Sequence, residues 1–189
     1  MFWRISATIV LTLILIICEA GSVRAARPLR QSFLRMEPPR EIPNFIVRDS
    51  SGQILTLHEV LKREANGGFV LLNVWATWCV PCIGEMQSLN SLQGRLKGLT
   101  VVTLAEDQEG QYSVPAMMRR NNYSQVKVYL DPEGLAVRRF RLRGIPTTLL
   151  INASGLEVGR VKSNVDWMNQ DNLAFLDQLV NTPDKLARR

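Results

Sequence analysis

Two cysteines separated by two residues, Cys79 and Cys82, are the side chains of this chain best suited to redox chemistry. An apolar run rich in β-branched and aromatic residues precedes them and predicts a buried strand over Phe69–Trp75. From Ile83 onward, apolar residues recur at spacings of three and four and predict a helix, whose first turn suits Pro81. Cys79 should therefore lie at a helix N-terminus, where free N–H groups and the helix dipole stabilise a thiolate. This placement makes Cys79 the expected nucleophile and the more enclosed Cys82 the expected resolving thiol.

The same cysteine pair is compatible with a structural disulfide or with half of a zinc site. A zinc site needs further thiolate or imidazole ligands. The chain has only one other cysteine, Cys18 near its start, and one histidine, His58. The order strand, CxxC and helix favours a redox-active pair, Cys79 and Cys82, and the sequence predicts neither a metal site nor a cofactor.

The residues WATWCVPC, followed by Glu85 and Met86, resemble the thioredoxin superfamily. Within it they are similar to the membrane-tethered TlpA/ResA-type thiol–disulfide oxidoreductases of bacteria. A second match, over residues 143–148, is similar to the loop that carries the cis-proline of this family. The resemblance covers about residues 41–180. It implies an α/β, thioredoxin-like fold: a central mixed β-sheet flanked by helices, with an N-terminal β-hairpin extension and a central αβ insert.

Glu85 lies three residues beyond Cys82 and therefore on the same face of the predicted helix. An enclosed carboxyl group there would have a raised pKa and could exchange a proton with Cys82. TlpA/ResA proteins are similar in having a glutamate at this spacing. The alternative is an exposed acid near a helix start, where the dipole alone favours it. Asn73 stands where thioredoxins place a buried acid, so proton exchange is expected of Glu85 and hydrogen bonding in the core of Asn73.

Three further residues are expected to contact the substrate. The resemblance predicts a cis bond between Ile145 and Pro146, which would turn the Ile145 backbone outward to pair with an extended substrate segment. A trans-proline that opens a strand is the alternative. Trp78, next to Cys79, would either shield the disulfide and contact partners or serve only in packing.

The rest of the chain predicts alternating strands and helices that complete this fold. Thr56 and Glu59 form a capping-box pattern at the start of a short helix. Asp131 and the residues after it predict a turn into a short basic helix. Strands are predicted at 44–47, 54–57, 99–105, 127–130, 147–151 and 157–161, and helices at 58–64, 113–121 and 169–180.

The N-terminus has the pattern of a targeting segment. Arg4 precedes an apolar run over 5–18, which is shorter than the ~20 residues that span a bilayer. Residues 1–26 are therefore expected to be a signal peptide or an N-terminal membrane anchor, with 2–18 as the anchoring segment. Either choice predicts export, which in a bacterium means the periplasm. Residues 27–40 are expected to be a linker, 41–180 the thioredoxin-like domain and 181–189 a flexible tail.

Composition narrows the classes of partner. The chain has 189 residues, is 46% hydrophobic and carries a formal net charge of +6. Its lysines and arginines are scattered among acidic residues, which favours a solvated basic surface over a nucleic-acid interface. An anionic membrane surface or an acidic partner protein stays compatible with this charge.

The resemblance implies an exported reductase of disulfides in other proteins. Cys79 and Cys82 would take electrons from a membrane electron donor of the thiol-reducing type and pass them to oxidised client proteins. TlpA/ResA proteins serve respiratory metalloprotein assembly, so the expected clients are a copper-delivery protein of cytochrome oxidase or apocytochrome c. No nucleic-acid partner is expected.

Other functions compete with this reductase. A disulfide-forming oxidase depends on a very low cysteine pKa, which a histidine inside CxxC helps to achieve. The residues between the cysteines here are uncharged, Val80 and Pro81. A non-enzymatic copper chaperone of this fold uses a longer cysteine spacing and a distant histidine, and nothing after Cys82 is a histidine. A peroxiredoxin would need a resolving cysteine far from the first.

Overall fold

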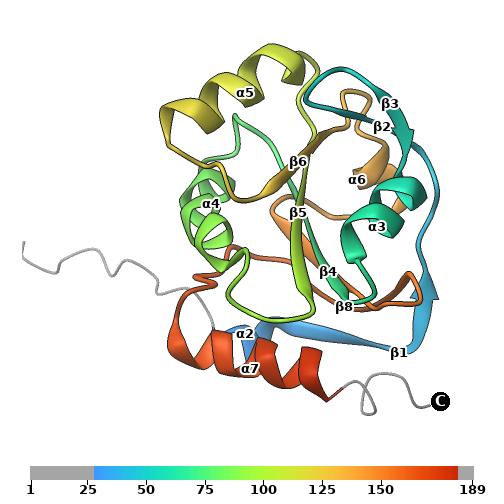
Figure 1. The fold of residues 1–189 in the computed structure, drawn as a ribbon, viewed down its shortest axis with the longest axis vertical. Helices are drawn as coiled ribbons and strands as arrows, with labels where there is room; N and C mark the ends of the chain where they lie inside the picture. Colours follow the sequence, from blue (N-terminus) through green and yellow to red (C-terminus); the bar gives the residue numbers. More distant parts are fainter. Residues whose placement is uncertain (1–27, 183–189) are drawn as a thin grey trace, which may run out of the picture.

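The computed structural model describes residues 28–182, so the predicted leader, 1–26, and all but the first two residues of the predicted tail lie outside the described residues. The described residues form a single eight-stranded sheet that is flanked by helices on both faces (Figure 1). The strands are β1 (Phe33–Glu41), β2 (Ile46–Asp49), β3 (Ile54–Thr56), β4 (Phe69–Trp75), β5 (Leu99–Ala105), β6 (Lys127–Leu130), β7 (Thr147–Ile151) and β8 (Leu156–Val161). The helices are α2 (Leu29–Ser32), α3 (Leu57–Ala65), α4 (Val80–Leu92), α5 (Gly110–Arg120), α6 (Leu135–Arg139) and α7 (Gln170–Asn181).

The strand order in the sheet is β1-β8-β7-β4-β5-β6-β2-β3. β4, β5 and β6 run parallel to one another, whereas β7 runs antiparallel to β4. The carboxyl ends of the three parallel strands and the beginning of β7 therefore meet at one edge of the sheet. The segments that follow β4 and precede β7 carry the CxxC sequence and the Ile-Pro sequence, so the topology brings these two distant motifs together.

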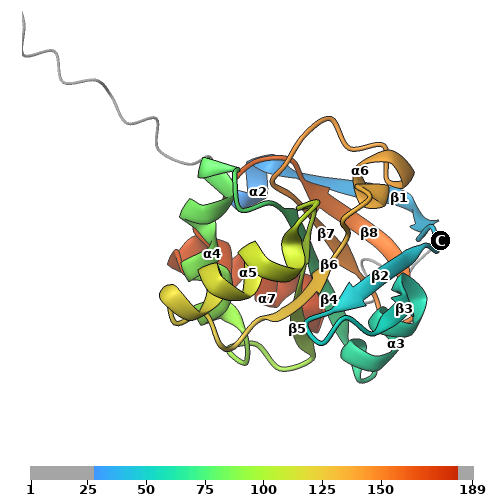
Figure 2. The same cartoon turned by 90° about the horizontal axis from the view of Figure 1, so that it is seen from above.

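The two faces of the sheet have separate apolar cores because side chains alternate along β4. Trp75 and its odd-numbered neighbours pack against α2, α4, α5 and α7. Val74 and its even-numbered neighbours pack against α3 and α6. All seven residues of β4 are buried, as the apolar run predicts. Figures 1 and 2 show α4 and α5 on one side of the sheet and α3 and α6 on the other.

The predicted N-terminal hairpin and its helix are confirmed. β2 and β3 pair antiparallel, and β2 joins the sheet beside β6. Thr56 caps α3 with a complete capping box in which Glu59 accepts a hydrogen bond from the Thr56 backbone N–H at 2.7 Å. The predicted helix over 113–121 begins three residues earlier, at Gly110, because the glycine there weakened the helical pattern without preventing the turn.

The predicted linker over 27–40 is wrong from residue 29 onward, since α2 and β1 occupy it. β1 is an edge strand that pairs only with β8, and its register shifts between Arg35 and Arg40. Pro38 and Pro39 lie in this interval, where an edge strand tolerates residues without an N–H donor. The irregular pairing leaves no alternation of apolar and polar residues, so the pattern of the sequence did not reveal the strand.

Packing explains why this N-terminal segment is ordered. The ring of Phe33 covers Gly159 so closely that a Cβ atom at residue 159 would collide with it. The backbone N–H of Leu29 donates to the Asn172 side chain on α7 at 2.8 Å. The thioredoxin-like unit therefore begins at α2, before residue 41. Among residues 28–182, none of the helices has the length and apolar character that a bilayer crossing requires.

Candidate active site

Cys79 and Cys82 are joined by a disulfide at the start of α4, so the structure represents the oxidised protein. Cys79 is the N-cap residue, and its Sγ accepts a hydrogen bond from the backbone N–H of Cys82 at 3.3 Å. A free helix N–H group therefore already points at the sulfur that would carry the thiolate after reduction. Cys79 is 6% exposed and Cys82 is 0% exposed, so an incoming group meets Cys79 first.

The Ile-Pro loop lies directly beside this disulfide. The bond between Ile145 and Pro146 is cis, as predicted. The carbonyl oxygen of Ile145 lies 3.8 Å from Cys79 Sγ, so the two motifs are in contact. The loop is fixed on its other side by Thr147, whose hydroxyl donates to the Gly144 carbonyl at 2.8 Å.

Two large apolar side chains next to Cys79 are open to solvent. Trp78 is 68% exposed and Val80 is 79% exposed. Trp78 buries only a small part of its surface within its own chain, which leaves most of its ring free to contact another molecule. The prediction that Trp78 faces partners is therefore favoured over a packing role.

Glu85 is enclosed, which agrees with the first of its two predicted placements, an enclosed carboxyl group, and not with an exposed acid near a helix start. It is 2% exposed on the inner face of α4, one helical turn after Cys82. Burial raises the pKa of the Glu85 carboxyl group to about 7, although hydrogen bonds from Val165 and Asn73 oppose the shift. This carboxyl group is therefore able to gain and lose a proton near neutral pH, a property that an exposed acid at a helix start lacks.

The hydrogen bonds of Glu85 connect three elements. Its Oε1 accepts from the Asn73 side chain on β4 at 2.7 Å, and its Oε2 accepts from the Val165 backbone N–H at 2.9 Å. The Asn73 amide also donates to the Thr148 hydroxyl on β7 at 2.9 Å. The hydroxyl of Ser88, one turn further along α4, accepts from the backbone N–H of Trp167 at 3.2 Å and holds the same C-terminal loop. The buried carboxyl group thus joins α4, the sheet and the loop before α7.

Asp107 is a site residue that the sequence analysis missed. Both of its carboxylate oxygens accept a hydrogen bond from the Thr77 backbone N–H, at 3.2 and 3.0 Å, and Oδ1 also accepts from the Thr77 hydroxyl. Asp107 therefore fixes the turn that leads into Trp78 and Cys79. The pairing register of β4 and β5 indicates this contact. Trp75 pairs with Ala105, and Thr77 and Asp107 each lie two residues beyond this pair.

Metal-binding groups are sparse in this region. Among residues 28–182, no cluster of three or more histidine, cysteine or acidic side chains has the geometry to hold a metal ion. His58 lies on α3, on the opposite face of the sheet from α4, and its Nε2 lies 2.7 Å from the Ile42 carbonyl oxygen. The reactive groups that the structure brings together at this site are the two sulfurs and the nearby carboxyl group of Glu85.

This combination of a mixed sheet, a CxxC pair that begins a helix and a cis-proline beside the pair defines a thioredoxin-like thiol–disulfide oxidoreductase. Residues 38–156 match the AhpC/TSA family. The chain belongs to that family and, within the thioredoxin superfamily, to the ResA-type thiol–disulfide oxidoreductases. Sequence similarity to ResA proteins carries the second assignment.

Two relatives illustrate this sequence similarity. The chain is 30% identical over 130 residues to the thiol–disulfide oxidoreductase ResA of Bacillus cereus, which covers 68% of this chain and 71% of that protein. It is 28% identical over 152 residues to ResA of Bacillus thuringiensis subsp. konkukian, which covers 79% of this chain and 84% of that protein. The similarity spans both the CxxC region and the strands that flank it.

Solved structures share the fold. A thiol:disulfide interchange protein DsbE from Chlorobium tepidum superposes with a TM-score of 0.60 at 24% identity, covering 75% of this chain and 94% of that one. A DsbF homologue from Corynebacterium diphtheriae superposes with a TM-score of 0.62 at 18% identity, covering 82% and 97%. At these identities the two structures support the architecture alone.

Proposed function

We propose that this protein reduces disulfides of partner proteins outside the cytoplasm, during assembly of respiratory metalloproteins. The observation that carries the proposal is the asymmetry of the two cysteines. Cys79 is slightly exposed at a helix N-terminus beside the Ile145 carbonyl group, whereas Cys82 is fully buried. The first sulfur can meet a protein substrate, and the second can only meet the first. A structural disulfide would have no need of this asymmetry.

The proposed reaction transfers two electrons in two exchange steps. The Cys79 thiolate attacks one sulfur of the client disulfide, forming a mixed disulfide while the other client sulfur leaves as a thiolate. The Cys82 thiolate then attacks Cys79 Sγ, which forms the bond seen in this structure and releases the second client thiolate. Both client sulfurs end as thiols after taking up two protons. The protein is oxidised in the process and needs a thiol-reducing membrane donor to begin again.

Glu85 is proposed to exchange a proton with Cys82 in the second step. The resolving thiol must lose its proton before it attacks, and it lies where no solvent reaches it. A buried carboxyl group with a pKa of about 7, one helical turn away, is suited to accept that proton. Asn73 would hold the carboxyl group in place during the transfer.

The proposed clients are a copper-delivery protein of cytochrome oxidase or apocytochrome c with its haem-attachment cysteines. Support comes from the ResA-type membership of the chain and from the resemblance of its motifs to TlpA/ResA proteins. We propose a periplasmic location, with residues 2–18 as a tether to the inner membrane if the leader is retained. The apolar N-terminal run in the sequence supports this location.

Substrate trapping tests this function. In the Cys82→Ser variant the second step is blocked, so mixed disulfides with clients should accumulate at Cys79. Cys79→Ser is the matched control and should trap nothing. Capture of copper-delivery proteins or apocytochrome c by the Cys82→Ser variant would support the proposal. Capture of no client by that variant would refute it.

The direction of electron flow has its own measurement. A reductase is expected because Val80 and Pro81 between the cysteines carry no charge that would strongly stabilise a thiolate. Equilibration with glutathione should give a reduction potential below about −180 mV, on a scale where thioredoxin lies at about −270 mV. A potential near about −120 mV would instead indicate a disulfide-forming oxidase.

A further inference from the structure

Three arginines occupy the segment that leads from α6 to the cis-proline. Arg139, Arg141 and Arg143 are exposed, whereas the residues between them, Phe140 and Leu142, turn inward and are buried or half-buried. We call residues 139–143 the arginine segment. Exposed and inward-facing side chains alternate along this segment, so the three arginines face solvent while Phe140 and Leu142 attach the segment to the protein.

The arginine segment is anchored firmly to the protein. Phe140 is buried and packs edge-to-face on Phe45, with ring centroids 5.9 Å apart. The Phe140 carbonyl group accepts a hydrogen bond from Arg160 at 3.1 Å. Arg160 is itself buried and paired with Glu157 at 2.6 Å. The exposed arginines therefore start from a backbone position that is already fixed, which lowers the entropy lost when they bind a partner.

Arg141 has a left-handed backbone conformation, with a φ angle of +52°. This conformation costs about 1–2 kcal/mol for a residue with a Cβ atom, and glycine or asparagine would adopt it more readily. The hydrogen bond from the Leu142 N–H to the Val137 carbonyl, at 2.9 Å, maintains the turn. Within residues 28–182 no hydrogen bond or ion pair of the Arg141 side chain offsets this cost, which points to a role for its charge outside the fold.

The three guanidinium groups have no partner among the described residues. None of the ion pairs or side-chain hydrogen bonds within residues 28–182 involves them. Arg138, the preceding residue, differs because its charge lowers the pKa values of Glu106 and Asp131 against the raising effect of their burial. The positive charge of the arginine segment is therefore not neutralised from within the protein.

The arginine segment borders the contact between the Ile-Pro loop and the disulfide. Arg143 precedes Ile145 by two residues, so the two Cα atoms are at most about 7 Å apart. Figure 2 shows the chain between α6 and β7 arching along one end of the molecule and descending beside the start of α4. A protein segment that reaches Cys79 across Ile145 therefore lies close to Arg143, and Arg141 and Arg139 precede Arg143 by two and four residues along the chain.

We propose that the arginine segment recruits clients through acidic residues placed within roughly six positions of the client cysteine. The inference rests on the proposed reduction of partner proteins and adds a charge preference to it. Arginine forms charge-assisted, bidentate hydrogen bonds with carboxylates, and exposed complementary charges mainly accelerate encounter. Trp78 and Val80 provide apolar contact near Cys79, while the arginines supply the charge selection on the Ile145 side.

The test compares two peptides and two triple variants of the full chain, each first reduced with dithiothreitol. One peptide carries a disulfide flanked by aspartates and the other carries the same disulfide flanked by serines. In the test variant, Arg139→Gln, Arg141→Asn and Arg143→Gln remove the charges, and asparagine suits the left-handed position. In the control variant, glutamine replaces Arg95, Lys97 and Lys127.

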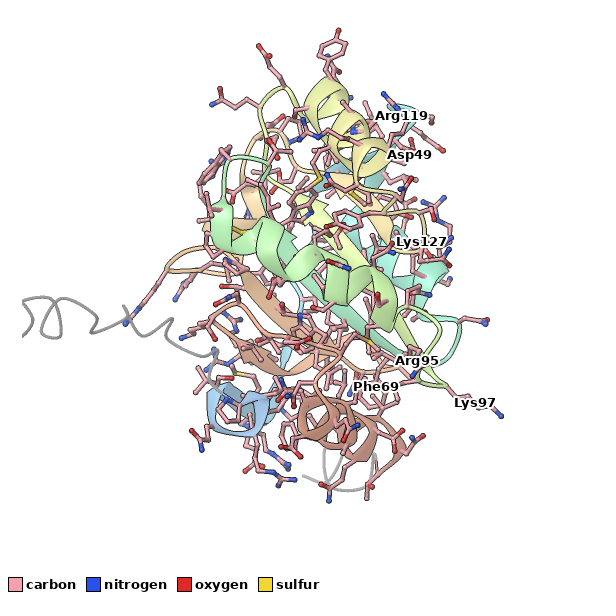
Figure 3. The ribbon with its side chains drawn as sticks, turned by 90° about the vertical axis from the view of Figure 1, so that its left-hand side faces the viewer. Asp49, Phe69, Arg95, Lys97, Arg119 and Lys127 are labelled. Atoms are coloured by element: carbon pink, nitrogen blue, oxygen red, sulfur yellow. A yellow bond between two sulfur atoms is a disulfide. The ribbon has the colours of Figure 1, made fainter. Side chains whose placement is uncertain are left out.

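The control removes the same charge far from the site. Arg95 and Lys97 lie beyond the C-terminal end of α4, and Lys127 lies on the same side of the molecule (Figure 3). α4 has 13 residues and is therefore about 20 Å long, which exceeds the screening length of about 8 Å at physiological salt. A change in net charge alone would affect both variants equally.

At low salt the wild type should reduce the acidic peptide about tenfold faster than the neutral one, and added salt should remove the difference. The test variant should lose this preference, and the control should keep it. Equal rates for both peptides in the wild type, or an equal loss in both variants, would overturn the proposal. The proposal would also be overturned if the wild type reduced both peptides at equal rates and bound phosphatidylglycerol vesicles through the three arginines. If the wild type failed to reduce either peptide, the underlying reductase function would be refuted instead.

Discussion

The side-chain amide of Asn73 donates a 2.7 Å hydrogen bond to the buried carboxyl group of Glu85. Its Oδ1 atom has no hydrogen-bond partner in the described structure. An amide that turns by 180° about its last torsion would offer Oδ1 to a protonated Glu85 and Nδ2 to an ionised one. Asn73 can therefore serve either protonation state of Glu85, which a second acid at residue 73 could not do without competing for the proton.

The first prediction concerns the stability of the oxidised protein against pH. The pKa of Glu85 is about 7 in the folded state, and its ordinary value, which the unfolded chain is expected to have, is 4.5. Between these values the folded protein keeps a proton that the unfolded chain releases, so stability should fall as pH rises from 4.5 to 7. The full change is about 3 kcal/mol. Glu85→Gln should remove this dependence, as measured by urea unfolding at several pH values.

The control for this experiment is Glu41→Gln, which removes an exposed glutamate on β1 and should leave the pH dependence of wild type unchanged. The same Glu85→Gln protein should also reduce client disulfides more slowly, by ~10²-fold if proton exchange with Cys82 is lost. An unaltered rate together with an unaltered thiol titration would assign Glu85 a purely structural role.

The second prediction places a second carboxylate beside the first. Asn73→Asp would bring two carboxyl groups within hydrogen-bonding distance in the core, where they should share one proton and titrate as a coupled pair. Relative to the wild type, Asn73→Asp should lower the free energy of unfolding several-fold more at pH 8 than at pH 5, because both groups must ionise at the higher pH. Combining Asn73→Asp with Glu85→Gln leaves a single carboxyl group and should remove this excess. If Asn73→Asp lowered the free energy of unfolding by the same amount at both pH values, the coupling would be contradicted.

Sequence patterns predicted most of the fold because each central element has a strong local signal. The buried run of β4, the capping box of α3 and the Ile-Pro loop were all confirmed in position. β1 was missed because irregular edge pairing and two prolines leave no periodic pattern. The burial of Glu85 was predicted only as one of two alternatives, since a helix start suits both an enclosed and an exposed acid.

The contact between Asp107 and Thr77 could not be predicted from local pattern. It joins loops that follow two different strands, and only the pairing register of β4 and β5 brings them level. The arginine segment was visible as a short basic stretch, but its relation to the disulfide depends on the chain path from α6 to β7. Long-range geometry of this kind emerges only when the sheet has been assembled.

The third prediction concerns the reactivity of the two thiols in the reduced protein. Cys79 should be alkylated much faster than Cys82, because it has the helix N–H groups and the only solvent access of the pair. Mass spectrometry after brief treatment with iodoacetamide would locate the label. Equal labelling of the two cysteines, or preferential labelling of Cys82, would reverse the proposed roles of nucleophile and resolving thiol.

The last prediction tests whether Asp107 positions the turn before Cys79. In Asp107→Asn an N–H₂ group replaces one of the two oxygens that accept from the Thr77 N–H, so this donor keeps a single, uncharged acceptor. The lost charge-assisted bonds should lower the free energy of unfolding by about 1–3 kcal/mol. Because the turn carries Trp78 and Cys79, the alkylation rate of Cys79 should change as well, which a merely stabilising residue elsewhere would not cause. Thr77→Val is the matched comparison, since it removes the hydroxyl donor and keeps the backbone one, and its effects should be smaller. An Asp107→Asn protein that is destabilised but has wild-type Cys79 reactivity would limit Asp107 to a structural role.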